Sequence, residues 1–359
     1  METFWIKAAQ LILSLSILVV LHEMGHFIPA KLFKTKVEKF YLFFDVKFSL
    51  FKKKIGETVY GIGWLPLGGY VKIAGMIDES MDKEQMKKPP EPWEFRSKPA
   101  WQRLIIMLGG VTVNIIVGIV IYIMVISVWG VDYIPKENLD EGLAVNEILY
   151  EYGFQDGDKI LNIDGEPLQN QLEINKYLML RDIDQIEVLH ADGNTEKLNI
   201  PEDIGDKLFQ SGAMFPFGLK LEPIIDSVLP NEPGMKAGLE KGDKMLAVNG
   251  KTTPYWDDFT KAVANAESDT IQLNYVNAYD QEKTTQIVLN EDKKIGIAVA
   301  NNMADLVEHQ NYSFAESLTA GFSYGYWTLR DYVAQFKFIF TKKGASQVGG
   351  FGAIGNLFP

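Results

Sequence analysis

Apolar residues gather in two long blocks of the chain, and a weaker third block follows a polar middle region. The first block, 4–21, contains only four polar residues, and the second, 104–129, contains 26 residues without a formal charge. A helix of about 18 residues rises about 27 Å, which is close to the thickness of a bilayer core. The pattern therefore predicts membrane-spanning helices at 1–33 and 101–130.

The third block, 317–340, is less apolar, because three charged residues follow its uncharged run at 317–329. It fits either an amphipathic helix at the membrane surface or a third span, and an external middle region before it favours a third span at 312–341. For the first block, a cleavable signal peptide is the alternative. The missing basic cluster before the block and the missing small-residue cleavage site after it disfavour that alternative.

Residues 34–78, between the first two blocks, have the pattern of short strands. Aromatic and β-branched runs at 40–44, 59–64 and 69–73 are separated by glycine and proline. Such a β-element can dip towards the membrane helices and pair with an unwound substrate, or it can be a small cytosolic hairpin. Periodicity does not decide between the two. The charged, proline-containing residues 79–100 predict a solvated linker.

A sequence repeat divides the polar middle region into two parts. Residues 152–165 and 237–250 share a glycine, an apolar residue, a Gly-Asp turn, a strand and a final Asp-Gly or Asn-Gly. Each copy predicts a positive-φ turn, a strand and a tight turn, so the region holds two homologous β-rich modules, at 131–210 and 211–300. The pattern resembles the core of PDZ domains, which capture extended peptides or chain termini at a sheet edge. The second copy is the closer match.

The charge distribution indicates which parts face the cytoplasm. Residues 27–100 hold 14 Lys/Arg against 9 Asp/Glu, whereas residues 131–310 hold 15 against 34. Basic residues concentrate in cytoplasmic loops, so we expect residues 27–100 to face the cytoplasm and the acidic PDZ-like modules to face outwards. The chain has no cysteine, which excludes disulfides and thiolate metal ligands. No basic patch indicates nucleic-acid binding.

The residues with the clearest chemistry end the first block, where the sequence reads His22-Glu23-Met24-Gly25-His26. Histidines four positions apart share one helix face, so both imidazoles can bind one zinc ion. Glu23 can then take a proton from a water molecule at the metal. Ionisable groups in a span are costly and usually functional, which disfavours a chance match.

Two features of the second block allow more than one interpretation. Asn114 fits an interhelical hydrogen bond better than a role in orienting the substrate or the metal site. The pair Gly109-Gly110 fits close packing against another helix.

The order of these features resembles the bacterial site-2 protease family, the intramembrane zinc metalloproteases of the regulator-of-sigma-E protease type. Further matching pieces are residues 61–75, 98–103 and 349–355, and the resemblance covers essentially the whole chain. It implies a multi-span α-helical membrane protein with a membrane-associated β-element and two PDZ-like β-rich extracytoplasmic domains. It also implies that His22 and His26 bind Zn²⁺ and that Glu23 is the general base.

The resemblance further implies how the substrate is handled. The β-element guides the substrate, with binding residues expected at Gly61, Gly63, Gly68, Gly69 and Tyr70, together with Asn114. The substrate is a single-span membrane protein already cleaved by another protease, such as an anti-sigma factor. The PDZ-like pair binds a peptide or acts as a size filter against large ectodomains.

The sequence departs from the family pattern at two places. Family members carry a glycine-x-glycine turn where this chain has residues 43–45, Phe-Phe-Asp. The family's third zinc ligand is an aspartate of a Leu-Asp-Gly motif, which is absent from this sequence. His190 and His309 are expected to be ordinary surface histidines that do not replace it.

Two protein ligands are too few for a catalytic zinc. We therefore expect the sequence to be part of a longer protein, with 342–359 as the start of a cytoplasmic loop, and these residues alone to be inactive. The alternatives are a non-catalytic membrane scaffold with a vestigial metal motif and a protein with a structural or transported metal.

Overall fold

The computed structural model describes residues 2–76, 89–300, 302–341 and 354. The chain forms two compact units, one containing residues 1–128, 312–329 and 339–359, the other containing residues 129–311 and 330–338. Residues 77–88 of the predicted linker lie outside the described residues. So does the family-like stretch 349–355, apart from residue 354.

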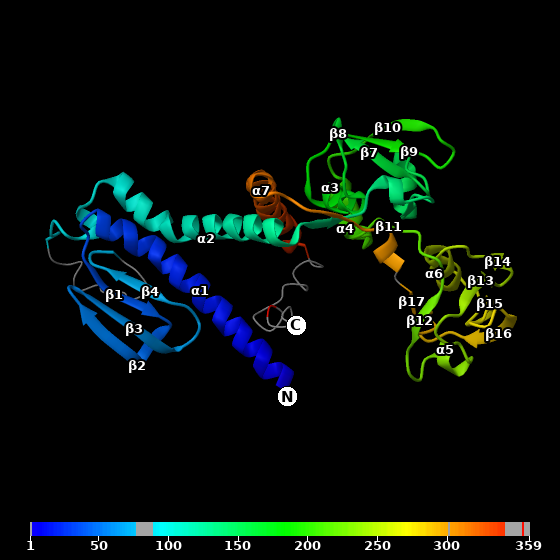
Figure 1. The fold of residues 1–359 in the computed structure, drawn as a ribbon, viewed down its shortest axis with the longest axis horizontal. Helices are drawn as coiled ribbons and strands as arrows, with labels where there is room; N and C mark the ends of the chain where they lie inside the picture. The colour runs from blue at the N-terminus through cyan, green and yellow to red at the C-terminus, as the bar shows by residue number, and fades with distance from the viewer. Residues whose placement is uncertain (1, 77–88, 301, 342–353, 355–359) are drawn as a thin grey trace. The chain divides into compact units, whose positions relative to one another are not determined.

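Unit 1 contains two long helices and a four-stranded sheet (Figure 1). Its elements are α1 (Glu2–Leu32), β1 (Val37–Leu42), β2 (Phe44–Ile55), β3 (Thr58–Leu65), β4 (Tyr70–Ile73) and α2 (Ala100–Trp129), followed far along the chain by the first part of α7 (Phe314–Ile339). The strand order is β2-β3-β1-β4, with β1 parallel to β3 and antiparallel to β4. The sheet packs on α1 through β1 and β4.

A small apolar core joins the sheet to both helices. Its buried members come from α1, β1, β4, α2 and the short 3-10 helix before α2, and they are Ala30, Val37, Val71, Ile73, Phe95 and Ile106. Burial of these side chains removes apolar surface from water at the end of α1 that carries the histidine motif. The β-element therefore lies beside the motif, as the first of its two sequence interpretations requires.

The turn after β1 shows how the chain manages without the family's glycines. Phe43 adopts a left-handed conformation with φ +67°, which normally favours glycine. Gly63 of β3 makes room for this turn, because a Cβ there would lie 2.2 Å from the carbonyl oxygen of Phe44. The left-handed residue thus lies in the turn between β1 and β2, whereas the glycine that makes room for the turn lies in β3.

The sequence pattern did not predict β2. Its residues are mostly exposed and include the charged run 52–54, so they lack the buried alternation of a typical strand. Lysines on an edge strand discourage pairing with other chains. Strand β2 forms because β3 offers a partner along almost its whole length, from Phe44 opposite Leu65 to Ile55 opposite Thr58.

Unit 2 contains two β-rich modules that follow one another in the sequence. The first is made of β5 (Val131–Tyr133), β6 (Leu143–Val145), β7 (Lys159–Ile163), β8 (Glu166–Pro167), α3 (Ile174–Leu180), β9 (Gln185–Leu189), β10 (Thr195–Asn199), α4 (Ile204–Ser211) and β11 (Phe217–Leu219). The second is made of β12 (Ile225–Val228), α5 (Pro233–Lys236), β13 (Lys244–Val248), β14 (Lys251–Thr252), α6 (Trp256–Ala264), β15 (Thr270–Val276), β16 (Glu282–Val288) and β17 (Ile297–Val299). Strand β18 (Glu308–Gln310) then returns to pair with β5.

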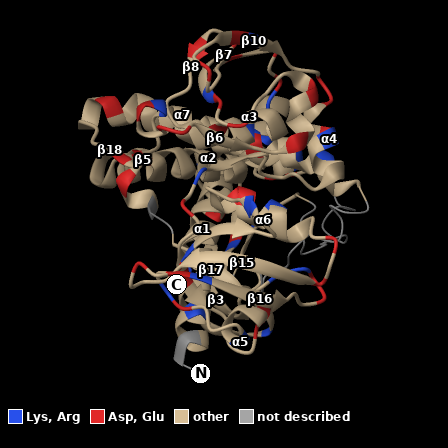
Figure 2. Ribbon diagram, turned by 90° about the vertical axis from the view of Figure 1, so that its right-hand side faces the viewer, with Lys and Arg blue, Asp and Glu red and all other residues tan. Residues whose placement is uncertain are grey.

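The two copies of the repeat fold alike. The four-stranded sheets have the orders β10-β9-β7-β8 and β16-β15-β13-β14, and the short pairs β6–β11 and β12–β17 correspond as well. Each module has its own buried apolar core. Acidic side chains are spread over both modules, whereas α2 is almost free of charge (Figure 2).

The last part of α7 belongs to unit 2 and packs on the first module. The Arg181 guanidinium donates to both carboxylate oxygens of Asp331, at 2.9 and 2.8 Å. Phe338 is buried in the core of this module and stacks on Phe209, with ring centroids 4.4 Å apart.

Within the described part of the chain, α1 and α2 are long and apolar enough to cross a bilayer. Helix α7 does not meet that test, and charged residues such as Asp331 account for its lower apolarity. The third crossing at 312–341 and the predicted domain boundaries therefore stay predictions.

Candidate active site

The two histidines of the motif converge on one point. Both lie on α1, and the Nε2 atoms of His22 and His26 are 3.3 Å apart. Two nitrogens that each lie about 2.05 Å from a tetrahedral zinc ion are separated by about 3.3 Å. The i, i+4 spacing therefore gives a pair of lone pairs at the separation that one zinc ion requires.

Hydrogen bonds from α2 fix how the imidazole rings are turned. His26 Nδ1 lies 2.7 Å from the carbonyl oxygen of Ile106. A carbonyl can only accept, so Nδ1 carries the proton and Nε2 keeps its lone pair for a metal. This contact joins residues 80 positions apart in the sequence.

Asn114 makes the corresponding contact with the other ring. Its Nδ2 lies 3.1 Å from His22 Nδ1, while its Oδ1 is buried without a hydrogen-bond partner among the described residues. The two ends of an amide have nearly the same shape, and turning the amide over lets Oδ1 accept from Nδ1–H. That arrangement satisfies the oxygen and leaves Nε2 of His22 available. The interhelical hydrogen bond predicted for Asn114 is therefore present, and its partner is a histidine of the motif.

A glycine of α2, Gly110, lies directly against the two Nε2 atoms. A Cβ on Gly110 would lie 2.5 Å from His26 Nε2 and 2.7 Å from His22 Nε2, so the space in front of both nitrogens exists because this side chain is missing. One residue earlier, a Cβ on Gly109 would lie 1.9 Å from the carbonyl oxygen of Gly25. The helix backbones touch there, which brings α2 close enough to reach both rings.

From the sequence, Gly109 and Gly110 were predicted to serve helix packing only. Their position next to the imidazole rings was not predicted. The sequence feature that could have indicated it is a glycine pair in the same span as Asn114.

The glutamate of the motif lies between α1 and the β-element. Glu23 is buried, with a relative exposure of 9%. A Cβ on Gly69, just before β4, would lie 3.4 Å from Glu23 Cγ and 2.6 Å from a methyl group of Val19. Gly69 therefore lets the start of an edge strand approach the motif closely.

The other predicted substrate residues contact the β-element itself. Cβ atoms on Gly61, Gly63 and Gly68 would meet, respectively, the Tyr41 ring, the Phe44 backbone and the Phe44 ring. The Tyr70 hydroxyl donates to Asp45 at 2.8 Å. The structure brings Gly69 to the motif, whereas these four residues shape the sheet.

The ligands that a zinc ion needs are only partly present. Nε2 of His22 and Nε2 of His26 fit one ion, and Gly110 provides the space. Among the residues that the structure describes, no group of three or more His, Asp or Glu side chains is placed to hold a metal. Within the described part of the chain, the motif thus offers two imidazole nitrogens that fit one zinc ion.

The expectation that His190 is a surface histidine was wrong. The side chain is buried in the first module, where Nδ1 lies 2.6 Å from Asp158 and Nε2 lies 3.2 Å from Glu196. Burial opposes the charge, but the hydrogen bonds to the two carboxylates outweigh it and raise the pKa of His190 above its ordinary value. Both ring nitrogens are engaged within the module.

This raised pKa predicts a loss of first-module stability as the pH increases. The contribution of His190 is complete below the ordinary pKa of about 6.5 and disappears as the pH rises through the raised pKa of the folded state. The matched variant is His190→Asn, because Asn277 holds the corresponding place after β15 in the second module. The free energy of unfolding, measured by hydrogen exchange of the Ile160 and Ile186 amides, should fall with pH above 6.5 in the parent. In His190→Asn it should not show this fall. The same slope in both proteins would contradict the prediction.

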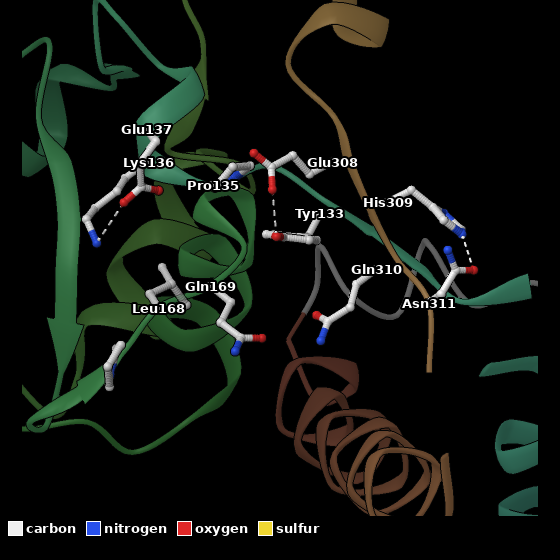
Figure 3. Close-up of a pocket in the computed structure, with 11 residues that line it drawn as sticks. Tyr133, Pro135, Lys136, Glu137, Leu168, Gln169, Glu308, His309, Gln310 and Asn311 are labelled. Atoms are coloured by element: carbon white, nitrogen blue, oxygen red, sulfur yellow. Dashed lines mark hydrogen bonds and ion pairs between the residues drawn. The ribbon is translucent and has the colours of Figure 1, made fainter. Parts of the chain in front are cut away.

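His309 lies in β18 and borders a cleft of unit 2. The cleft has a volume of about 740 Å³ and is lined by residues 133, 135–137, 167–169 and 308–311 (Figure 3). His309 Nδ1 lies 2.7 Å from Asp132, and Nε2 lies 3.2 Å from Asn311 Oδ1. With both nitrogens engaged locally, His309 does not extend the motif.

Comparison with known proteins identifies the class. The profile of peptidase family M50 matches residues 10–351. The chain belongs to peptidase family M50, as its resemblance to site-2 proteases predicted.

Individual relatives agree with this assignment. The regulator of sigma E protease of Haemophilus influenzae is 29% identical over 89% of this chain and 73% of its own length. The regulator of sigma-E protease RseP of Escherichia coli is 28% identical over 76% of this chain and 61% of its own length. A Borreliella burgdorferi protein, named as a proposed zinc metalloprotease, is 25% identical over 85% of this chain and 68% of its own length.

Proposed function

We propose that this protein is an intramembrane zinc metalloendopeptidase that cleaves transmembrane segments of single-span membrane proteins in regulated intramembrane proteolysis. The observation that carries the proposal is the 3.3 Å separation of the His22 and His26 Nε2 atoms on an apolar helix, with Glu23 between them in sequence. Relatives named as sigma-E regulators and zinc metalloproteases support it. A membrane-bound anti-sigma factor is the substrate class we expect.

The chain's own residues divide the chemistry as follows. His22 and His26 would hold the zinc, which when bound lowers the pKa of water and polarises the substrate carbonyl. Glu23 takes a proton from the attacking water as the new C–O bond forms. It then gives that proton to the amine nitrogen as the C–N bond breaks. Ile106 and Asn114 would hold the imidazole rings so that both Nε2 atoms stay directed to one point.

Strand β4 supports a role in presenting the substrate. Among the described strands, β4 pairs with β1 alone, so it forms an edge of the sheet next to Gly69 and Glu23. A transmembrane helix must unwind before its peptide bonds can be attacked, and pairing with an edge strand holds an extended segment in place. We place this reaction in the bacterial inner membrane, with the PDZ-like modules extracytoplasmic.

Metal removal tests the proposal. A zinc chelator should stop cleavage of a membrane-embedded reporter by the complete protein, and added zinc should restore it, because the reaction requires the ion. Cleavage would be followed in detergent by the appearance of the shortened reporter. If a protein shown to be free of zinc still cleaved the reporter at the same rate, the proposal that it is a metalloprotease would be rejected. A non-catalytic scaffold, which is the alternative function, would show no cleavage under either condition.

A further inference from the structure

The first PDZ-like module has a short strand whose outer edge is already occupied. Strand β11 pairs with β6, and Phe217 lies opposite Val145 in that pair. The Val145 N–H points away from β11, since it donates to Asp156 Oδ1 at 2.9 Å. In an antiparallel ladder, two residues may lie opposite each other without hydrogen-bonding each other. Each then directs its N–H and its C=O away from the other strand. The N–H and C=O of Phe217 therefore face the edge where an added strand would pair.

Both of these groups bind a side chain of α3. Phe217 N–H donates to Asn175 Oδ1 at 2.9 Å, and Asn175 Nδ2 donates to the Phe217 carbonyl at 3.0 Å. A side-chain amide presents the same donor and acceptor as a peptide group. Asn175 is 7% exposed and Phe217 is 2% exposed, so the pair is shielded from water. The amide thus takes the place that one residue of an added strand would fill.

The second module lacks this contact. The repeat places Gly157 and Gly242 at an offset of 85 residues, so Thr260 of α6 corresponds to Asn175. Thr260 is exposed, and its hydroxyl donates to Asp257 of its own helix at 3.0 Å. Ala298, which lies opposite Ser227 in the β12–β17 pair, corresponds to Phe217 and is exposed. The described residues show no side-chain hydrogen bond to Ala298.

We propose that Asn175 is a built-in substitute for a bound peptide strand and keeps the edge of β11 closed. An extended peptide could pair there only by breaking both hydrogen bonds and leaving the Asn175 amide buried without partners, which costs free energy. The first module therefore does not bind peptides, and it contributes only by excluding large ectodomains through its size. The inference refines the peptide or size-filter role expected for the PDZ-like pair within the proposed function.

The test measures how many peptide strands the protein binds. The parent is the complete protein with Glu23→Gln, so that the probe is not cleaved and a failure of the protease proposal does not affect the result. Asn175→Thr gives the first module the residue that the second carries. The probe is a fluorescein-labelled decapeptide of alternating threonine and valine with a free carboxyl end. Isothermal titration should show one more bound probe per chain in Asn175→Thr than in the parent.

Two further variants make the result interpretable. Thr260→Ala, at the corresponding exposed position of the second module, should not add a bound probe, because Thr260 holds no backbone group of the strand edge. Asn175→Asp still accepts from Phe217 N–H but cannot donate to its carbonyl, so it should also open the edge. Hydrogen exchange of Ile160 and Ile186 reports whether the module stays folded.

Three outcomes would overturn the proposal. The first is equal binding by the parent and the Asn175→Thr variant, including no binding by either. The second is an extra bound probe in Thr260→Ala as well. The third is unfolding of the first module in both Asn175 variants, because Asn175 would then be required for folding and not for closing the edge.

Discussion

Replacing Glu23 by glutamine is expected to reduce cleavage of a transmembrane reporter by about 10²- to 10⁴-fold, the usual contribution of a general base. Glutamine keeps the size of the side chain, which matters because Glu23 is buried where Gly69 approaches α1. It removes only the ability to take the proton from water and pass it to the amine. Since His22 and His26 remain, zinc content should stay near that of the parent.

The control for this variant is Met24→Leu, which alters an exposed apolar neighbour and should keep full activity. Reporter cleavage and bound zinc would be measured on the same purified complete protein. Cleavage that persists at the parent rate in Glu23→Gln would show that this carboxylate is not the base. Loss of zinc together with activity would instead indicate a structural role for Glu23.

Replacing Gly109 by alanine is expected to lower zinc affinity by about 10- to 100-fold, the range found when groups that orient metal ligands are displaced. The added Cβ would lie 1.9 Å from the Gly25 carbonyl oxygen, and both partners are helix backbone that cannot move aside locally. Helix α2 must shift away from α1. The hydrogen bonds of the Ile106 carbonyl to His26 and of Asn114 to His22 are then lost.

Helix α2 supplies its own control for this experiment. Gly118 has nothing within 4 Å of its Cβ position, so Gly118→Ala adds the same methyl group without a clash. Zinc affinity, measured by competition with a chromophoric chelator, should fall only in Gly109→Ala. Equal affinities in the two variants would mean that the contact between the helix backbones does not hold the site together.

Several features could be read from local sequence because their physical cause is local. The i, i+4 spacing alone puts His22 and His26 on one face of α1, whatever the rest of the chain does. The apolar lengths of α1 and α2 follow from composition, and the repeat at 152–165 and 237–250 predicts two modules of one topology. Strands β1, β3 and β4 were predicted because their aromatic and β-branched runs are continuous. Strand β2 was missed because its lysine-rich edge carries no burial pattern.

What the sequence by itself determined is the pair of imidazoles on one helix face, the glutamate beside them and the apolar helix that carries all three. Only the tertiary structure decided that Ile106 and Asn114 orient the rings and that Gly110 leaves the space in front of them. It also decided that Gly69 brings a strand to Glu23 and that Asn175 fills a strand edge. These contacts join segments up to 92 residues apart, and the periodicity of a segment does not specify the distant backbone that packs against it. The motif predicts two ligands, whereas the packing of α2 and the β-element on α1 gives them their geometry.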